Sequence, residues 1–144
     1  MAKVKDLLDA NKLLARVHLE ADREMKIHGI KDEELIVAGW GDAAHANRPD
    51  SNSTEGIFVG ITGESLLHGD EMPVSPVMWR SGKIHNVCKS PSAAEAKALV
   101  TLEDEVNAVR FQLSEMLGWK TAGESKEETI KSVRGVIATD SKST

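Results

Sequence analysis

The stretch LIVAGWGD, residues 35–42, decides the fold of this chain. Its first four residues form a continuous apolar run, and two glycines and Asp42 bound that run on its C-terminal side. A short apolar run that ends in turn residues is typical of a strand buried on both faces of a sheet. We therefore predict a central strand over residues 34–42 that delivers Asp42 to one end of a sheet.

Three further segments carry the pattern of a strand. GIFVGIT (56–62) and VSPVMWRS (74–81) follow the central strand in succession. The second is an expected edge strand, since Pro76 cannot donate a hydrogen bond to a neighbouring strand. VRGVIATD (133–140) is a fourth strand, and its apolar residues lead to Asp140.

The clearest helix of the chain lies between residues 90 and 118. Ser90 or Ser92 is a suitable N-cap, and Gly118 ends the helix. The apolar stripe consists of Leu99, Leu102, Val106, Val109, Leu113 and Met116. One step back along this stripe lies Glu95, which we therefore expect to face the sheet.

The remaining segments are less sharply patterned. Residues 3–21 predict a helix, and the alternation of REMKIHGI (23–30) predicts a short, half-buried strand. Residues 121–132 are charged and predict a solvated turn or short helix, and Trp79 is expected in the core.

Successive strands favour antiparallel pairing, and a long helix favours a crossover to a parallel strand. The predicted fold class is therefore α/β (α+β): one mixed sheet of three antiparallel strands, then a helix across the sheet and a strand parallel to the first.

Composition bounds the function. The 144 residues suit one domain, and the single cysteine, Cys88, excludes an internal disulfide and favours a reducing, intracellular setting. No apolar run of membrane-spanning length and no signal-peptide pattern is present, so we expect a soluble protein with no membrane partner. A net charge of -5 argues against tight, non-specific nucleic-acid binding, although it does not exclude a metal-dependent nuclease.

Three acids are expected to meet at one place. If the first and last strands are parallel neighbours, Asp42 and Asp140 emerge at the same edge, where ligands of such sheets collect. Glu95 in the first turn of the helix points at the same region. A set of carboxylates suits a hard cation such as Mg²⁺ or Mn²⁺, and two-metal phosphodiester hydrolysis is the chemistry that follows.

Each acid also has a structural interpretation. Asp42 and Asp140 suit turns, and Asp140 suits the cap of a further helix. Glu95 follows Ser92 by three residues, which is the spacing of a capping box. The joint placement of the three acids, rather than any one of them, supports a site.

The residues carry a resemblance to a known family. LIVAGWGDAAHANRPDSNSTEGIFVGIT resembles the opening of the ribonuclease H domain in copia-like retrotransposon Pol polyproteins. PVMWRSGK is similar to the tryptophan-serine-lysine strand of that family, and VCKSPSAAEAKAL to the serine-rich start of its first helix, where Glu95 holds the place of the catalytic glutamate. ATDSKS resembles the third acidic motif. Where the family often has another acid two residues before the glutamate, this chain has Ala93.

The resemblance covers residues 30–144 and implies a ribonuclease H of a reverse transcriptase, which hydrolyses the RNA strand of an RNA–DNA hybrid. It implies Asp42, Glu95 and Asp140 as catalytic residues and ligands of Mg²⁺ or Mn²⁺. Residues 1–29 resemble the connection to the polymerase part of the same polyprotein, which is the other implied partner.

In the family, a helix, another strand and a fourth carboxylate follow the third acidic motif. The resemblance therefore implies a partial domain, incomplete at its C-terminus, with one full metal site, weak or absent cleavage and an unpaired sheet edge. Two hypotheses stay open: an active ribonuclease H, and an inactive ribonuclease H-like fragment that binds nucleic acid or another protein.

Overall fold

The computed structural model describes residues 3–119, 123 and 125–140. In chain order, the elements are α1 (Val4–Leu19), η1 (Asp32–Glu34), β1 (Leu35–Ala44), β2 (Thr54–Gly63), η2 (Glu64–His68), β3 (Ser75–Lys83), α2 (Pro91–Met116), α3 (Lys126–Lys131) and β4 (Arg134–Ala138). Parts of two predicted motifs, at residues 120–122 and 124 and at residues 141–143, lie outside the described residues.

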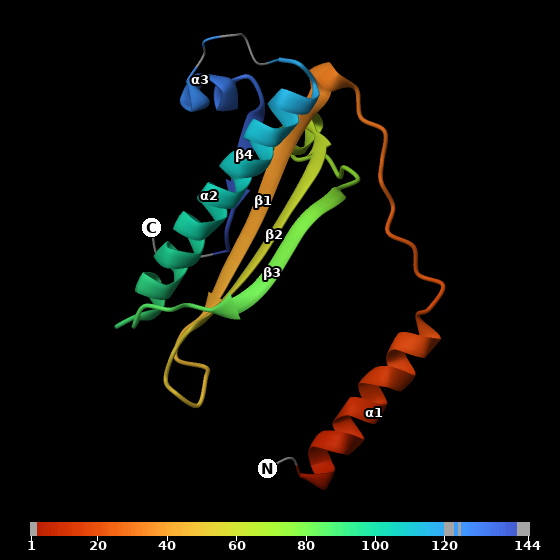
Figure 1. The fold of residues 1–144 in the computed structure, drawn as a ribbon, viewed down its shortest axis with the longest axis vertical. Coiled ribbons are helices and arrows are strands. Elements are labelled where there is room, and N and C mark those ends of the chain that lie inside the picture. Colours follow the sequence, from red (N-terminus) through yellow and green to blue (C-terminus); the bar gives the residue numbers. More distant parts are fainter. Residues whose placement is uncertain (1–2, 120–122, 124, 141–144) are drawn as a thin grey trace.

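The four strands form one mixed sheet in the order β3-β2-β1-β4. β1 pairs antiparallel with β2, β2 pairs antiparallel with β3, and β4 pairs parallel with β1. The long helix α2 makes the crossover between β3 and β4, and in the view of Figure 1 it runs roughly alongside β1. This confirms the predicted mixed α/β sheet, in an arrangement consistent with a ribonuclease H-like fold, and it confirms β3 as an edge strand.

One face of the sheet packs against α2. Because side chains alternate between the faces of a strand, Val37, Ile57 and Val59 point to the same side. They form a core with Leu102, Val106, Val109 and Val133, and Leu99 and Leu113 pack against it. Ala94 and Ala98 are fully buried nearer the N-terminus of α2. The predicted apolar stripe is therefore confirmed, except at Met116, which is 83% exposed.

Gly39 lets α2 approach β1 closely. A Cβ atom at this position would lie 2.6 Å from Cγ2 of Val106 and 2.9 Å from Cδ1 of Leu102. We expect Gly39→Ala to lower the free energy of unfolding by roughly 1–3 kcal/mol, the usual cost of overpacking a core. Urea unfolding measures the loss, and Gly82→Ala in β3 is the matched control because an added Cβ there meets nothing within 4 Å. An unchanged stability of Gly39→Ala would contradict this close packing.

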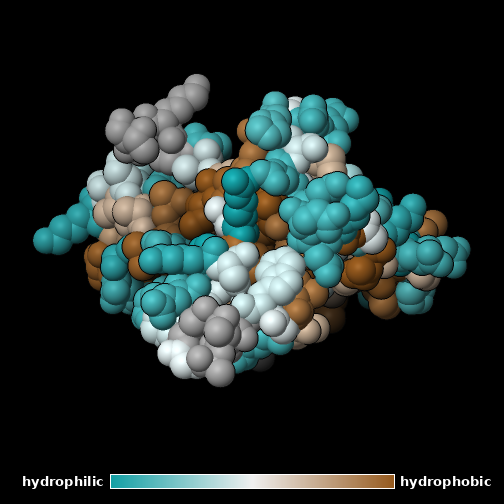
Figure 2. Space-filling model, turned by 90° about the horizontal axis from the view of Figure 1, so that it is seen from above, coloured by the Kyte–Doolittle hydropathy of each residue, from teal (hydrophilic) through white to brown (hydrophobic). Residues whose placement is uncertain are grey.

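The other face of the sheet, called here the open face, is only partly covered. Leu66 and Leu67 of η2 line a hollow over the middle of β1. Farther along β1, the rings of Trp40 and Phe58 lie 5.6 Å apart, and Trp79 stands opposite Phe58 on β3. Trp79 is 61% exposed, so its predicted place in the core is wrong. Figure 2 shows brown hydrophobic surface in the middle of the view, bordered by hydrophilic side chains.

The N-terminal segment stands away from the sheet. The predicted helix forms as α1, but none of its residues is buried, and Figure 1 shows it separated from the body of the fold by an extended linker. The predicted strand within 23–30 is wrong, since residues 23–31 form no strand. A hydrogen bond from the backbone N–H of His28 to Oγ of Ser75, 2.8 Å long, attaches the end of the linker to β3.

No helix in the described part of the chain is long and apolar enough to cross a bilayer.

Candidate active site

Two of the predicted acids lie at the same edge of the sheet. The parallel register pairs Trp40 of β1 with Ala138 of β4. Asp42 and Asp140 each follow that pair by two residues, so neighbouring strands deliver them to the same level. Both residues are exposed, and both line a hollow of about 570 Å³ on the open face. This placement is the one that the parallel pairing of the first and last strands predicts.

The hollow has an aromatic and backbone lining. Trp40 and Phe58 form one wall, Gly56 leaves space beside Asp42, and Ala138 and Thr139 lead to Asp140. Asp42 and Asp140 thus offer carboxylate oxygens to one hollow.

Glu95 reaches the same region from α2. The N-cap of α2 is Ser90, whose Oγ accepts a 3.2 Å hydrogen bond from the backbone N–H of Ala93. Pro91 occupies the first turn, where its missing N–H costs nothing. The alternative capping box between Ser92 and Glu95 is therefore wrong, and the carboxylate of Glu95 is not used as a cap.

One carboxylate oxygen of Glu95 lacks a hydrogen-bond partner among the described residues. This atom, Oε2, is buried. Burial raises the pKa of Glu95 above its ordinary value of 4.5, and the charge of Asp42 raises the pKa further. The backbone amide of Ala43 lowers the pKa, and the charge of Asp140 adds a smaller increase. Asp42 and Asp140 therefore both lie close enough to Glu95 to raise its pKa.

The arrangement fits a divalent cation in its chemistry. An unpartnered carboxylate oxygen with two neighbouring carboxylates is an oxygen-only donor set, which suits Mg²⁺ or Mn²⁺. Within residues 3–119, 123 and 125–140, no three His, Cys, Asp or Glu side chains are already gathered closely enough to hold an ion. The structure thus brings the three acids into one region without placing them in a finished ligand shell.

Removing the charge of Glu95 should stabilise the metal-free protein. A pKa raised by folding means that the folded chain holds the proton more tightly than the unfolded chain, so ionisation costs stability as the pH rises above about 4.5. We expect Glu95→Gln to be more stable than wild type in metal-free buffer at neutral pH, with the difference vanishing in acid. Urea unfolding of both proteins across this pH range measures the effect. A variant that is less stable at neutral pH would show that the carboxylate is well solvated or paired.

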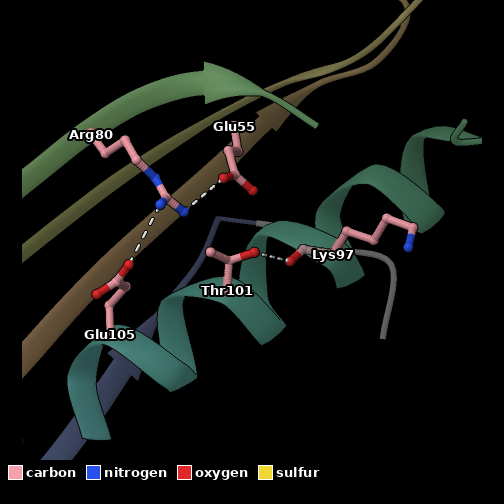
Figure 3. Close-up of polar contacts among 5 residues, drawn as sticks. All are labelled: Glu55, Arg80, Lys97, Thr101 and Glu105. Carbon is pink, nitrogen blue, oxygen red and sulfur yellow. Dashed lines mark hydrogen bonds and ion pairs between the residues drawn. The ribbon is translucent and has the colours of Figure 1, made fainter. Parts of the chain in front are cut away.

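Sequence reasoning did not single out a group of polar residues beside the hollow. Arg80 of β3 donates to Oε1 of Glu55 at 2.9 Å and lies 3.5 Å from Oε1 of Glu105 on α2 (Figure 3). The side chain of Glu55 is only 10% exposed. Side chains alternate along a strand, so Glu55 faces the same side of the sheet as Ile57 and Val59, the side that α2 covers. This alternation is the sequence pattern from which the position of Glu55 could have been predicted.

Arg80 also borders a second depression. This basic cleft, of about 510 Å³, lies between the end of β3 and α2 and is lined by the cations Arg80, Lys83 and Lys97 together with His85 and Glu55. In Figure 3, Lys97 and Thr101 project from α2 on the same side as Arg80. Since Arg80 lines both depressions, the basic cleft and the hollow with Asp42 are neighbours.

The histidines and the cysteine do not form a catalytic pair. Cys88 is buried, and its Sγ lies 3.6 Å from the carbonyl oxygen of Asn86. The Nε2 atom of His45 lies 3.0 Å from the carbonyl oxygen of Cys88 rather than from its sulfur. Both side chains therefore support the loop that precedes α2.

Comparison with known proteins identifies no family: no protein-family profile, curated protein or solved structure matches the chain.

Proposed function

We propose that this chain is a ribonuclease H-like domain of the retroelement reverse-transcriptase type, which hydrolyses the RNA strand of an RNA–DNA hybrid with Mg²⁺ or Mn²⁺. The observation that carries the proposal is the convergence of Asp42, Asp140 and Glu95, whose buried Oε2 atom has no hydrogen-bond partner among the described residues, at the end of the parallel β1–β4 pair. The resemblance of the acidic motifs to those of copia-like elements supports the same function.

Asp42, Glu95 and Asp140 would hold the divalent ion. Such an ion would supply an activated water and would stabilise the oxygen that leaves the cleaved phosphodiester. The residues of the chain position this chemistry: β1 and β4 fix the two aspartates at one level, and the burial of Glu95 against Ala43 limits the directions in which its carboxylate points.

The basic cleft gives the hybrid a place to bind. Arg80 lines both the cleft and the hollow, so a strand bound in the cleft would pass near the hollow that holds Asp42. Contacts between the cations of the cleft and phosphates position a nucleic acid without reading its sequence. Because contacts between Lys or Arg and phosphates release counterions, we expect this binding to weaken as the salt concentration rises.

The test is cleavage of a hybrid whose RNA and DNA strands carry different labels, in Mg²⁺ and separately in Mn²⁺. The proposal expects metal-dependent products from the RNA strand alone, and no products from a DNA duplex of the same sequence. Cleavage that persists in a chelator, or that cuts both strands, would contradict it.

A second candidate is a module that binds the hybrid, or the polymerase part of a polyprotein, without cleaving. The basic cleft favours it, because its three cations are suited to phosphates whether or not a metal site forms. Retention of a labelled hybrid by the folded protein, without turnover in either metal, is the result that selects this candidate.

A further inference from the structure

Helix α1 has an apolar surface with nothing to cover it in its own chain. Its seven large apolar side chains are each more than half exposed: Val4, Leu7, Leu8, Leu13, Leu14, Val17 and Leu19. Leu7 and Leu14 are seven residues apart and therefore lie on one side of the helix. Since an isolated helix of 16 residues is only marginally stable in water, α1 needs a packing partner.

The open face of the sheet is the matching surface. Trp79 is 61% exposed and Val77 is 43% exposed, and they continue the aromatic wall that Trp40 and Phe58 form. Strands of nine and ten residues give this face a length of roughly 30 Å, and α1 is about 24 Å long. The helix therefore fits along the face beyond η2.

The linker favours a partner copy over the same chain. Ser75, to which His28 is attached, pairs with Ile61 of β2. Ile61 in turn pairs with Val37, whose side chain packs against α2, so the linker leaves the body on the side that α2 covers. The exposed residues 21–27 span at most about 24 Å. Within one chain they would have to turn around the edge of β3 to bring α1 onto the open face.

The charge of α1 is also complementary to that of the rest of the chain. Residues 3–20 carry four Lys or Arg and three Asp or Glu, so α1 is net positive in a chain whose net charge is -5. Lys5, Lys12 and Arg16 follow one flank of the apolar stripe. The rest of the chain therefore carries a net charge of -6 (-5 minus the +1 of residues 3–20), which is the complementary sign.

We propose that the chain forms a symmetric dimer in which α1 of each copy packs on the open face of the other. The exchange is reciprocal, so one two-fold axis generates two identical contacts and leaves no open end for further growth. The docked helix lies beside the hollow that holds Asp42 and Asp140, and it covers the aromatic wall in both copies.

Light scattering on the full chain, over a range of concentrations, tests the proposal. We expect a dimer for wild type and for Met116→Gln, a control at an exposed apolar side chain of α2. We expect monomers for the double variant Leu7→Gln/Leu14→Gln, and for Trp79→Thr. Glutamine keeps the helix propensity of leucine, and threonine suits an edge strand, so circular dichroism should show that the secondary structure of both variants is retained.

Mixing the two monomeric variants sharpens the test. The α1 variant keeps an intact open face, and the Trp79 variant keeps an intact helix, so a mixture should recover one of the two contacts and form a heterodimer. A wild-type chain that stays monomeric overturns the proposal. Hydrogen exchange of the α1 amides would then show whether the helix packs on the sheet of its own chain, where the amides are protected, or stays in solvent, where they are not. A dimer that Trp79→Thr leaves intact also overturns it, because the contact would then lie elsewhere.

Discussion

Replacing Asp42 with asparagine is expected to reduce metal-dependent cleavage of the RNA strand by about 100-fold or more. The substitution keeps the size of the side chain and removes the charge that, with Asp140, faces the hollow at the end of the β1–β4 pair. A divalent ion held by oxygen ligands depends on the number of carboxylate charges around it. Initial rates on the labelled hybrid, at saturating Mg²⁺ and again at limiting Mg²⁺, measure both the loss of turnover and any loss of metal affinity.

Glu95→Gln should cause a loss of similar size, and exposed acids of α2 provide matched controls. Asp104→Asn and Glu103→Gln change the same chemical groups at exposed positions, and we expect wild-type rates from both. Because Glu95→Gln is also expected to stabilise the metal-free protein, its loss of activity cannot be explained by unfolding. Equal activity of Asp42→Asn and Asp104→Asn would exclude Asp42 from the site.

The strand order was predictable because local pattern and connection length agree. The apolar run of residues 35–38 specifies a strand covered on both faces, and α2 does cover one face of β1. The helix of 26 residues between β3 and β4 is long enough to cross the sheet, and this makes the last strand parallel. The joint position of Asp42 and Asp140 follows from that one parallel pairing.

Features that depend on exposure were not predictable. Trp79 has the composition of a core residue, but an edge strand and an uncovered face leave it mostly in solvent. The alternation at Met25 and Ile27 fits a strand, yet residues 23–31 form an extended linker without sheet partners. The local pattern correctly predicts an apolar residue at position 79 and an extended backbone at residues 23–31. Tertiary packing determines whether the residue is buried and whether the extended segment pairs in a sheet.

The polar details of the site depend on register. Choosing Ser90 rather than Ser92 as the N-cap decides whether Glu95 is used in a capping box or left to face Asp42. The pairing of Arg80 with Glu55 requires β2 and β3 to be aligned, and a register shift between Val59 and Gly60 interrupts that alignment. Sequence spacing does not specify such a shift, so this ion pair was not foreseen.

Truncating Leu102 is expected to cost the protein roughly 2–5 kcal/mol of unfolding free energy. Leu102 is fully buried at the centre of the α2 interface, and its side chain faces both Gly39 and Gly41 of β1. Glycines have no side chain that can move into the space left by Leu102→Ala, so the cavity should persist. Urea unfolding should show a lower midpoint with an unchanged slope, since the same surface is exposed on unfolding.

Val100→Ala is the control for this effect, because Val100 lies on the same helix and is 61% exposed. We expect its change in stability to stay within about 0.5 kcal/mol. The comparison also tests the candidate active site. Glu95 lies on α2, so its position near Asp42 depends on the packing of Leu102 between α2 and β1. Loss of hybrid cleavage in Leu102→Ala under conditions where the protein is still folded would show that this packing positions Glu95. Equal stabilities of Leu102→Ala and Val100→Ala would contradict the packing of α2 on the sheet.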